Sequence, residues 1–388
     1  MRLAGRDGEQ PMIYLDQAAT SLQKPPEVAQ CMMSALKTCA GYARSGHAPA
    51  LHAGEVVYQC REAAAALFAV DDPAKIIFTM NATHALNLAI HGFCRPDMTV
   101  AVSGYEHNSV MRPLHAIGCP LRILRSQLFD KTDFLREAER AIEAGAEFFI
   151  INHVSNVFGS IIPLEQLDAM LQAYGIPLIL DASQSAGAVP LDLHVLGSLC
   201  AVCMPGHKGL LGPQGTGLLI LPRGDMPIPL LQGGTGSASF SLEQPAFLPD
   251  RLESGTPNVP GISGLAAGIR FLLEADVAKI YLREQHLMSE FSAMLRTVPS
   301  LEVFAAENPV CQSGLVSVRI PGESSELLAQ ALAARDICVR GGLHCAPLAH
   351  RSAQTDTTGT VRFSLSPYTT ADELTQTVQV LREILCEM

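Results

Sequence analysis

Lys208 lies in a glycine-rich turn between two apolar runs of the sequence. The turn Gly206-His-Lys-Gly209 follows the run 201–204, and the apolar pattern resumes over 218–221. Lysine is rarely buried unless it is paired, and burial lowers the pKa of its amine toward the range in which the amine is a nucleophile. Such an amine can form a Schiff base with a carbonyl compound. On this stretch alone, a solvated turn lysine is the simpler interpretation.

Polar side chains also follow four other apolar runs, each of which is predicted to be a strand. In an open α/β sheet, ligands bind beyond the carboxyl ends of the strands, so side chains at these ends meet at one edge. The sequence therefore predicts a site at this edge that includes His207 and Lys208. The predicted strands cover 75–79, 99–102, 147–152 and 176–181, and the polar residues that follow them are Thr83, His107, Asn156, and Asp181 with Gln184.

The alternation of apolar runs with amphipathic stretches is typical of an α/β protein with a largely parallel sheet. We expect a large domain over 13–258 and a smaller α+β domain over 259–388, with the segment 1–20 packed near the smaller one. The turn between 104 and 109 is predicted to be polar and irregular. The expected helices cover 26–38, 51–68, 81–90, 261–274, 324–335 and 372–386, and further strands cover 315–320 and 362–365.

The composition excludes several classes of protein. The 388 residues are 48% hydrophobic and 17% charged, which indicates a compact globular chain. A net charge of −11 argues against a nucleic-acid partner. No apolar run approaches the roughly 18 residues of a membrane span, so we expect no membrane partner. Eleven cysteines without a framework pattern fit reduced thiols in the cytoplasm. Cys200 and Cys203 lie in the apolar run before Lys208, and we expect both to be core residues.

The polar set matches what pyridoxal 5'-phosphate (PLP) requires of a protein. PLP needs a lysine for its aldehyde, a carboxylate for its ring nitrogen, a flat partner for its ring and donors for its phosphate. Lys208, Asp181 and His107 could supply the first three, and Thr83 at a helix start could bind the phosphate. Each has a simpler interpretation: Asp181 and Thr83 as helix caps, and His107 as a surface residue. Two further residues could bond the phenolic oxygen or be ordinary loop residues: Gln184 and Asn156.

Taken together, the motifs resemble the class V aminotransferase family of fold-type I PLP enzymes, in particular its cysteine desulfurases and selenocysteine lyases. They occur in order from near residue 13 to the C-terminal helix, so the resemblance covers nearly the whole chain. It implies a large PLP-binding domain with a mainly parallel sheet flanked by helices, and a smaller α+β C-terminal domain. The matching segments are Tyr14-Leu-Asp-Gln-Ala-Ala-Thr20, Ala82-Thr83 with Asn87, Glu106-His107, His153-Val-Ser-Asn156, Asp181-Ala-Ser-Gln184, Gly206-His-Lys208, Glu253-Ser-Gly-Thr-Pro-Asn258 and Val339-Arg-Gly-Gly-Leu-His-Cys-Ala346.

The resemblance assigns a role to each candidate residue. Lys208 would carry the PLP, Asp181 would hold its ring nitrogen, His107 would stack on the ring, and Gln184 would bond the phenolic oxygen. The phosphate would be bound by Thr83 and His207, with Thr256 reaching it from the partner subunit of a homodimer. The amino-acid substrate would be held by Asn156 and Arg362, with Arg340 nearby. Pro205 replaces a serine of many relatives, so one phosphate-binding hydroxyl is missing.

Cys345 decides which reaction the family resemblance implies. By chance alone, one of eleven cysteines could lie in this loop, and a zinc site with His344 and His350 lacks a fourth ligand at a suitable spacing. The resemblance favours a third interpretation, in which Cys345 accepts sulfur and the neighbouring Arg340 and His344 favour its thiolate. Lys208 would take the substrate Cα proton, and Cys345 would attack the substrate sulfur to give a persulfide and alanine.

The leading hypothesis is therefore a PLP-dependent cysteine desulfurase that acts on L-cysteine and passes sulfur to an acceptor protein. A selenocysteine lyase acting on L-selenocysteine, or another class V enzyme such as an aminotransferase, is an alternative, although plain transamination needs no thiol. A sulfur carrier or scaffold subunit of low activity is an alternative of another class. The intact pair of Lys208 and Asp181 argues against it. No metal is expected.

Overall fold

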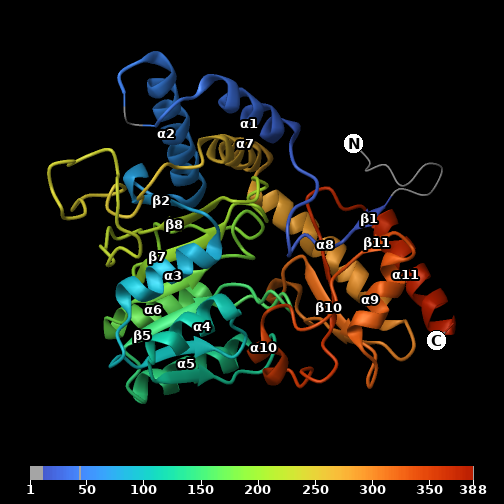
Figure 1. Cartoon of the computed structure of the whole chain (residues 1–388). Coiled ribbons are helices and arrows are strands. Elements are labelled where there is room, and N and C mark those ends of the chain that lie inside the picture. Colours follow the sequence, from blue (N-terminus) through green and yellow to red (C-terminus); the bar gives the residue numbers. More distant parts are fainter. Residues whose placement is uncertain (1–11, 43–44, 388) are drawn as a thin grey trace.

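The computed structural model describes residues 12–42 and 45–387, so the expectation for residues 1–11 lies outside the described ranges. The chain forms two lobes (Figure 1). The first is built on a sheet with the strand order β2-β8-β7-β6-β5-β3-β4. β8 is antiparallel to both of its neighbours, and the other neighbours pair in parallel. The strands are β2 (Ile76–Thr79), β3 (Val100–Ser103), β4 (Leu121–Leu124), β5 (Phe148–Asn152), β6 (Leu178–Asp181), β7 (Leu199–Pro205) and β8 (Gly217–Ile220).

Helices cover both faces of this sheet, which explains why its strands are apolar along their whole length. Phe149 and Ile151 point into a core shared with α2, α5, α6 and α7, whereas Ile150 points into a core shared with α3 and α4. α1 packs against α7. The helices are α1 (Pro26–Thr38), α2 (Ala48–Phe68), α3 (Ala82–Phe93), α4 (Asn108–Ile117), α5 (Lys131–Glu143), α6 (Leu164–Tyr174) and α7 (Val259–Ala275).

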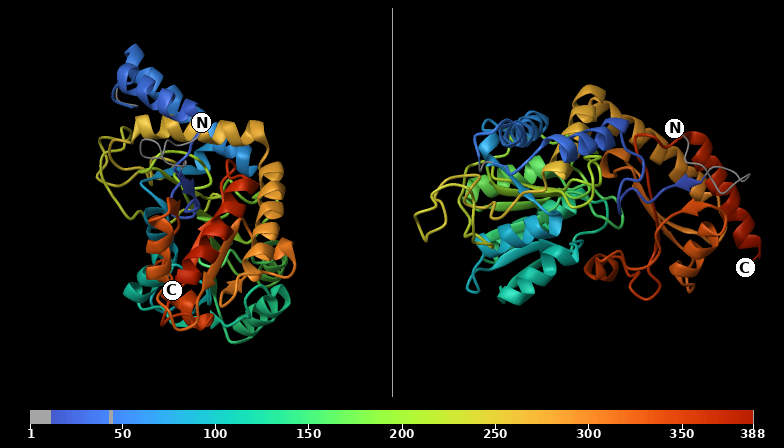
Figure 2. Two further views of the ribbon diagram at one scale, coloured as in Figure 1. Left: turned by 90° about the vertical axis from the view of Figure 1, so that its right-hand side faces the viewer. Right: turned by 45° about the horizontal axis from the view of Figure 1, so that its top comes forward.

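The second lobe has its own core around an antiparallel sheet with the strand order β12-β10-β9. α8 leads into it from α7, and α9 and α11 pack around the sheet (Figure 2). β1 pairs in parallel with β11, which brings Ile13 and Leu15 into this core. The elements are β1 (Ile13–Tyr14), α8 (Val277–Arg296), β9 (Glu302–Phe304), β10 (Leu315–Arg319), α9 (Ser325–Ala333), β11 (Ile337–Cys338), α10 (Pro347–Ser352), β12 (Val361–Ser364) and α11 (Ala371–Glu387).

The structure confirms the expected α/β architecture and most of the expected elements, including the helix over 26–38. The polar turn over 104–109 was predicted too long, because the side chain of His107 caps a helix that begins at Asn108. The domain boundary between 258 and 259 stays a prediction. Cys200 and Cys203 are buried, as expected of core residues. No helix within residues 12–42 and 45–387 is long and apolar enough to cross a lipid bilayer.

Candidate active site

A pocket lies at the carboxyl edge of the sheet, where β2, β3, β5, β6 and β7 all end. These strands run in the same direction, so the polar residues that follow them meet there. The pocket encloses ≈ 540 Å³ that no protein atom fills, including solvent at its mouth. Seven of the predicted residues line it: Thr83, His107, Asn156, Asp181, Gln184, His207 and Lys208.

Lys208 lies in the turn directly after β7. Gly206 is required in this turn, because a Cβ atom there would collide with the Thr216 hydroxyl. Burial lowers the pKa of the Lys208 amine to about 8, since it disfavours the charged form. The guanidinium of Arg362 contributes to this lowering, and the carboxylate of Asp181 opposes it. The site therefore holds a lysine that is readily deprotonated.

His107 is held at the pocket by the start of α4. Its Nδ1 accepts a hydrogen bond from the backbone N–H of Ser109 at 3.0 Å. Burial lowers the pKa of His107, so the ring is neutral at pH 7 and carries its proton on Nε2. The Ser109 hydroxyl lies 3.0 Å from the same Nδ1 and 2.8 Å from the Thr83 hydroxyl. Ser109 also lines the pocket and was missed in the sequence, where it looked like a turn residue.

Glu106 supports the turn before His107. It is fully buried, and its Oε1 accepts from the Ser103 hydroxyl at 2.6 Å and from the Asn152 backbone N–H at 2.9 Å. Burial raises the pKa of this carboxyl to about 8, so it is mostly protonated at neutral pH. Glu106 thus joins β3 to β5 where both strands reach the pocket. The Glu106-His107 motif was the signal that could have identified it.

The rest of the pocket is polar and fixed by neighbouring segments. Asp181 accepts a hydrogen bond from the backbone N–H of Ser183 at 2.9 Å, and Gln184 donates to the carbonyl of Ala18 at 3.1 Å. Nδ1 of His207 lies 3.0 Å from the hydroxyl of Thr20. Burial lowers the pKa of His207 to about 4, so this ring is neutral. It can offer a phosphate group a hydrogen bond but no charge.

These residues fit PLP by the chemistry of their groups. The pocket is lined by the amine of Lys208, the carboxylate of Asp181, the imidazole of His107 and the amide of Gln184. Helix α3 begins at the rim of this pocket. The first backbone N–H groups of a helix and its dipole favour an anion such as phosphate. The hydroxyls of Thr83 and Ser109 lie at the same end of the pocket. The hydroxyl of Ser109 can therefore replace the phosphate-binding hydroxyl that is missing at Pro205.

Arg362 lies beside this pocket on β12 and is almost completely buried. It donates to the Asn156 carbonyl at 2.8 Å and forms an ion pair with Asp16 at 2.9 Å. Its Nε and the Oδ1 of Asn156 are buried without a hydrogen-bond partner among the described residues. Buried polar groups are normally paired, so both groups indicate space for a polar ligand. The contribution of Asp16, 346 positions away from Arg362, was not predicted.

Cys345 is exposed on the loop before α10, and this loop contacts two residues at the pocket. The Cys345 carbonyl accepts from the Asn108 backbone N–H at 2.9 Å, next to His107, and Asn156 donates to the His344 carbonyl at 2.8 Å. A guanidinium N–H of Arg340 lies 3.7 Å from the sulfur. The loop thus presents a thiol, with a cation beside it, next to the pocket.

The expected contribution of His344 to the thiolate is wrong. The His344 ring is buried, and its nitrogens bond to His350 and to the Arg340 carbonyl. Burial and the nearby Arg362 hold the pKa of His344 well below its usual range, so it carries no charge. Within the described part of the chain, no group of three or more His, Cys, Asp or Glu side chains could hold a metal ion.

Thr256 does not line the pocket of its own chain and is exposed. The loop that carries it is anchored by Glu253, which accepts from the Phe78 backbone N–H and forms a buried ion pair with Arg61, both at 2.6 Å. The backbone N–H of Gly255 donates to the carbonyl of Gly234 at 2.8 Å. The structure therefore presents Thr256 on the outside of the folded chain.

Comparisons with known proteins concern the family of this chain and its fold. The sequence profile of the aminotransferase class-V family matches residues 13–377. A probable cysteine desulfurase of Pyrococcus abyssi is 31% identical over 97% of this chain and 95% of the relative. A probable cysteine desulfurase of Methanothermobacter thermautotrophicus is 29% identical over 96% and 94%. The apo structure of the cysteine desulfurase from Thermococcus onnurineus covers 97% of this chain and 95% of that chain, with a TM-score of 0.89 and 29% identity. Because the family profile spans nearly its whole length, this chain belongs to the aminotransferase class-V family.

Proposed function

We propose that this protein is a PLP-dependent cysteine desulfurase that converts L-cysteine to L-alanine and transfers the sulfur to Cys345. The observation that carries the proposal is the exposed thiol of Cys345 on a loop bonded to Asn108 and Asn156, next to a pocket that contains Lys208. An aminotransferase needs the pocket but not the thiol. The cysteine desulfurases among the relatives support the same assignment.

PLP would be held by the residues that line the pocket. Lys208 would bind its aldehyde, Asp181 its ring nitrogen and Gln184 its phenolic oxygen, with the His107 ring against its face. The first turn of α3 with Thr83, together with His207, would hold the phosphate. When bound, PLP supplies an electron sink for the substrate Cα.

Lys208 and Cys345 carry out the two transfers. The neutral Lys208 amine takes the Cα proton, for which a pKa near the working pH is best. The Cys345 thiolate attacks the substrate Sγ, so an S–S bond forms and the Cβ–Sγ bond breaks. The electron pair of the broken Cβ–Sγ bond stays with Cβ. This carbon then takes a proton, and Nε2–H of His107 is the donor. The products are alanine and a persulfide on Cys345.

The substrate carboxylate would bind at Arg362. The Nε–H of Arg362 lacks a partner among the described side chains, and the nearby Asn156 has an unpaired Oδ1. A guanidinium binds a carboxylate through two parallel hydrogen bonds. Asp16 already neutralises part of the charge and orients the guanidinium. The amino acid would thereby have its Cα held near Lys208.

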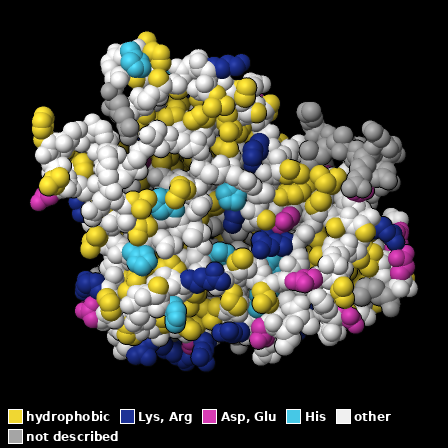
Figure 3. All heavy atoms as spheres, in the orientation of Figure 1, with side chains coloured by type: hydrophobic (Ala, Val, Ile, Leu, Met, Phe, Trp, Pro, Cys, Tyr) yellow, Lys and Arg dark blue, Asp and Glu magenta, His cyan; other side chains and the backbone are white. Residues whose placement is uncertain are grey.

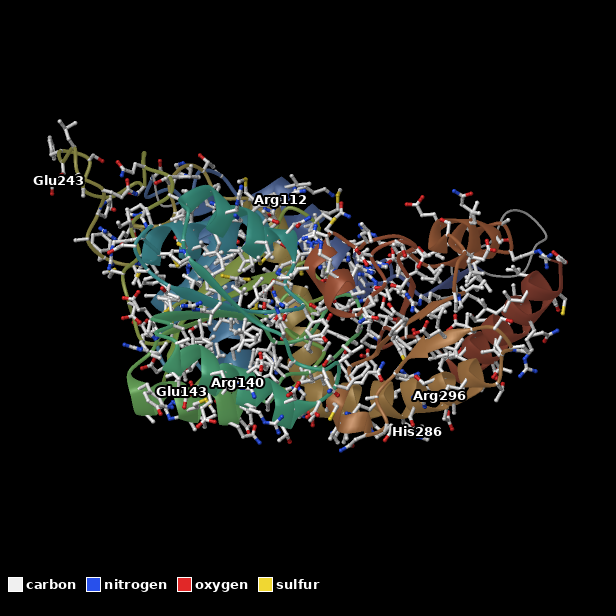
Figure 4. The ribbon with its side chains drawn as sticks, turned by 90° about the horizontal axis from the view of Figure 1, so that it is seen from below. Arg112, Arg140, Glu143, Glu243, His286 and Arg296 are labelled. Atoms are coloured by element: carbon white, nitrogen blue, oxygen red, sulfur yellow. The ribbon has the colours of Figure 1, made fainter. Side chains whose placement is uncertain are left out.

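We further propose a homodimer formed through the segment 226–247. Phe240 and Leu242 are fully exposed there, and contiguous exposed apolar side chains mark interaction sites. Figure 3 shows hydrophobic side chains at the tip of this protruding loop, and Figure 4 shows Glu243 at the same tip, away from the lobes. Because Gly255 bonds to Gly234, a partner that covers this segment would also meet Thr256.

The exposure of Cys345 supports transfer of the persulfide sulfur to an acceptor protein, since another thiol can approach it from solvent. Such exchange needs a reducing compartment, so we propose the cytoplasm as the location. The cysteines Cys31, Cys39, Cys311, Cys338 and Cys386 are also free and at least partly exposed, which fits the same compartment.

The test is alanine production from L-cysteine by the wild type and by Cys345→Ser, repeated with L-selenocysteine. We expect cysteine turnover to collapse in the variant, by a factor of about 100 or more, because a hydroxyl is a poor acceptor of sulfur. Turnover that is undiminished in the variant, or that occurs only with selenocysteine, would refute the desulfurase and favour a selenocysteine lyase. A low-activity scaffold would turn over neither.

A further inference from the structure

The backbone that carries the reactive thiol has an unusual conformation. His344 and Cys345 have φ angles of +50° and +57°, so two consecutive residues with side chains lie in the left-handed region. This region is disfavoured for residues other than glycine, and such residues persist only where their surroundings hold them there. Contacts with the rest of the protein must therefore hold the Cys345 segment.

The side chain of His344 supplies several of these contacts, in addition to the hydrogen bonds that Asn108 and Asn156 donate to the backbone. His344 is only 3% exposed, and its ring is nearly parallel to the ring of His350, with centroids 5.5 Å apart and 12° between the planes. Its Nε2 lies 3.1 Å from the Arg340 carbonyl, and its Nδ1 lies 3.3 Å from Nε2 of His350. Nδ1 of His350 in turn lies 2.7 Å from the hydroxyl of Thr355. His350 and Thr355 are both fully buried.

The chemistry of the partners determines the position of every proton in this chain. The Arg340 carbonyl only accepts, so Nε2 of His344 carries a proton and its Nδ1 is an acceptor. Nε2 of His350 must then donate to that Nδ1, which leaves Nδ1 of His350 as an acceptor. The hydroxyl of Thr355 therefore donates to it. The hydrogen bonds run in one direction, from Thr355 through His350 and His344 to Arg340.

A second proton on His344 would place its Nδ1–H against the Nε2–H of His350, so this arrangement requires a neutral His344 ring. Burial lowers the pKa of His350 to about 4 and that of His344 well below its usual range, which agrees with neutral rings. Arg362 and Arg340 add to the effect at His344, whereas Asp356 opposes it at His350. At neutral pH, every donor in this chain of hydrogen bonds therefore has an acceptor.

This chain of hydrogen bonds ends at Arg340, the residue that contacts the thiol of Cys345. The backbone of Arg340 accepts the last hydrogen bond, and its guanidinium lies 3.7 Å from the sulfur of Cys345. We propose that Thr355, His350 and His344 are positioning residues that hold Cys345 and Arg340 in the geometry for sulfur transfer. The inference rests on the proposed function and adds the device that orients its nucleophile.

Three variants separate the hydrogen bonds from the packing. Thr355→Val removes the first donor at nearly constant volume, and His350→Phe keeps a flat ring but removes both nitrogens. His350→Gln retains one donor and one acceptor and serves as the rescue. Thr358→Val is the matched control, because its hydroxyl lies in the same loop but outside the chain and bonds to Gly359.

The experiment compares two partial reactions of the PLP-loaded enzyme. One is persulfide formation on Cys345 in a single turnover with L-cysteine, measured by mass spectrometry of the peptide. The other is exchange of the L-alanine Cα proton in D2O, which requires Lys208 but not the thiol. We expect Thr355→Val and His350→Phe to slow persulfide formation about tenfold and to leave exchange within about twofold of wild type. His350→Gln should recover most of the persulfide rate, and Thr358→Val should behave as wild type.

A second measurement does not depend on activity. Amide hydrogen exchange over residues 340–350 should become faster in Thr355→Val and His350→Phe and recover in His350→Gln. If the wild type makes no alanine from L-cysteine but this exchange pattern appears, the proposed function fails and the positioning role stands. The inference is overturned if persulfide formation stays within twofold of wild type in both variants, or if both partial reactions fall by the same factor.

Discussion

The amine of Lys208 should titrate far below an ordinary lysine. Its pKa of about 8 follows from burial and from two arginines, Arg362 and Arg340, against the opposing carboxylate of Asp181. At pH 7, about 10% of such an amine is neutral, compared with about 0.03% at a pKa of 10.5, which is a gain of about 300-fold in reactive amine. The free amine is protonated below this pKa, so its nucleophilic reactivity should fall tenfold per pH unit below about pH 8.

Competitive acetylation of the cofactor-free protein, resolved by peptide mass spectrometry, measures this titration directly. Lys279 is exposed and serves as the internal control for the labelling. Arg340→Gln should raise the pKa of Lys208, because it removes a repulsive positive charge, and Asp181→Asn should lower it. A Lys208 midpoint above about 9.5, or shifts of the opposite sign in the two variants, would refute the electrostatic account of the site.

Three further predictions concern the substrate, the fold and the dimer. Arg362→Lys should raise the KM for L-cysteine about tenfold or more, because an ammonium cannot bind a carboxylate through two parallel bonds; steady-state kinetics with an unchanged KM would contradict this. Glu253→Gln should lower the free energy of unfolding by about 3 kcal/mol, since it leaves the buried guanidinium of Arg61 uncompensated. Urea denaturation measures this change, and a loss below about 1 kcal/mol would argue against a buried pair. Phe240→Asp combined with Leu242→Asp should convert the dimer to a monomer in light scattering; a dimer that survives would place the interface elsewhere.

The residues that follow the strands of the first lobe were predictable from sequence. Their strands are short apolar runs, and parallel strands of one sheet deliver their carboxyl ends to the same edge. Thr83, His107, Asp181 and Lys208 could therefore be assigned to one pocket before any contact was known, and the structure brings them together. The family resemblance rested on the same local motifs. The helix α8 was missed because much of its length is charged and half-exposed.

Tertiary structure alone decided which partners these residues have. Asp16 pairs with Arg362 across 346 positions, and Arg61 pairs with Glu253 across 192, spacings that no local pattern encodes. The same holds for the orientation of His344: a histidine beside a cysteine suggested a cation for the thiol, but its ring turns inward and bonds to His350. Sequence determines which groups reach the edge of the sheet, because strand direction and period are local properties. Burial, charge and hydrogen-bond partners depend on how distant segments pack, so only the folded chain determines them.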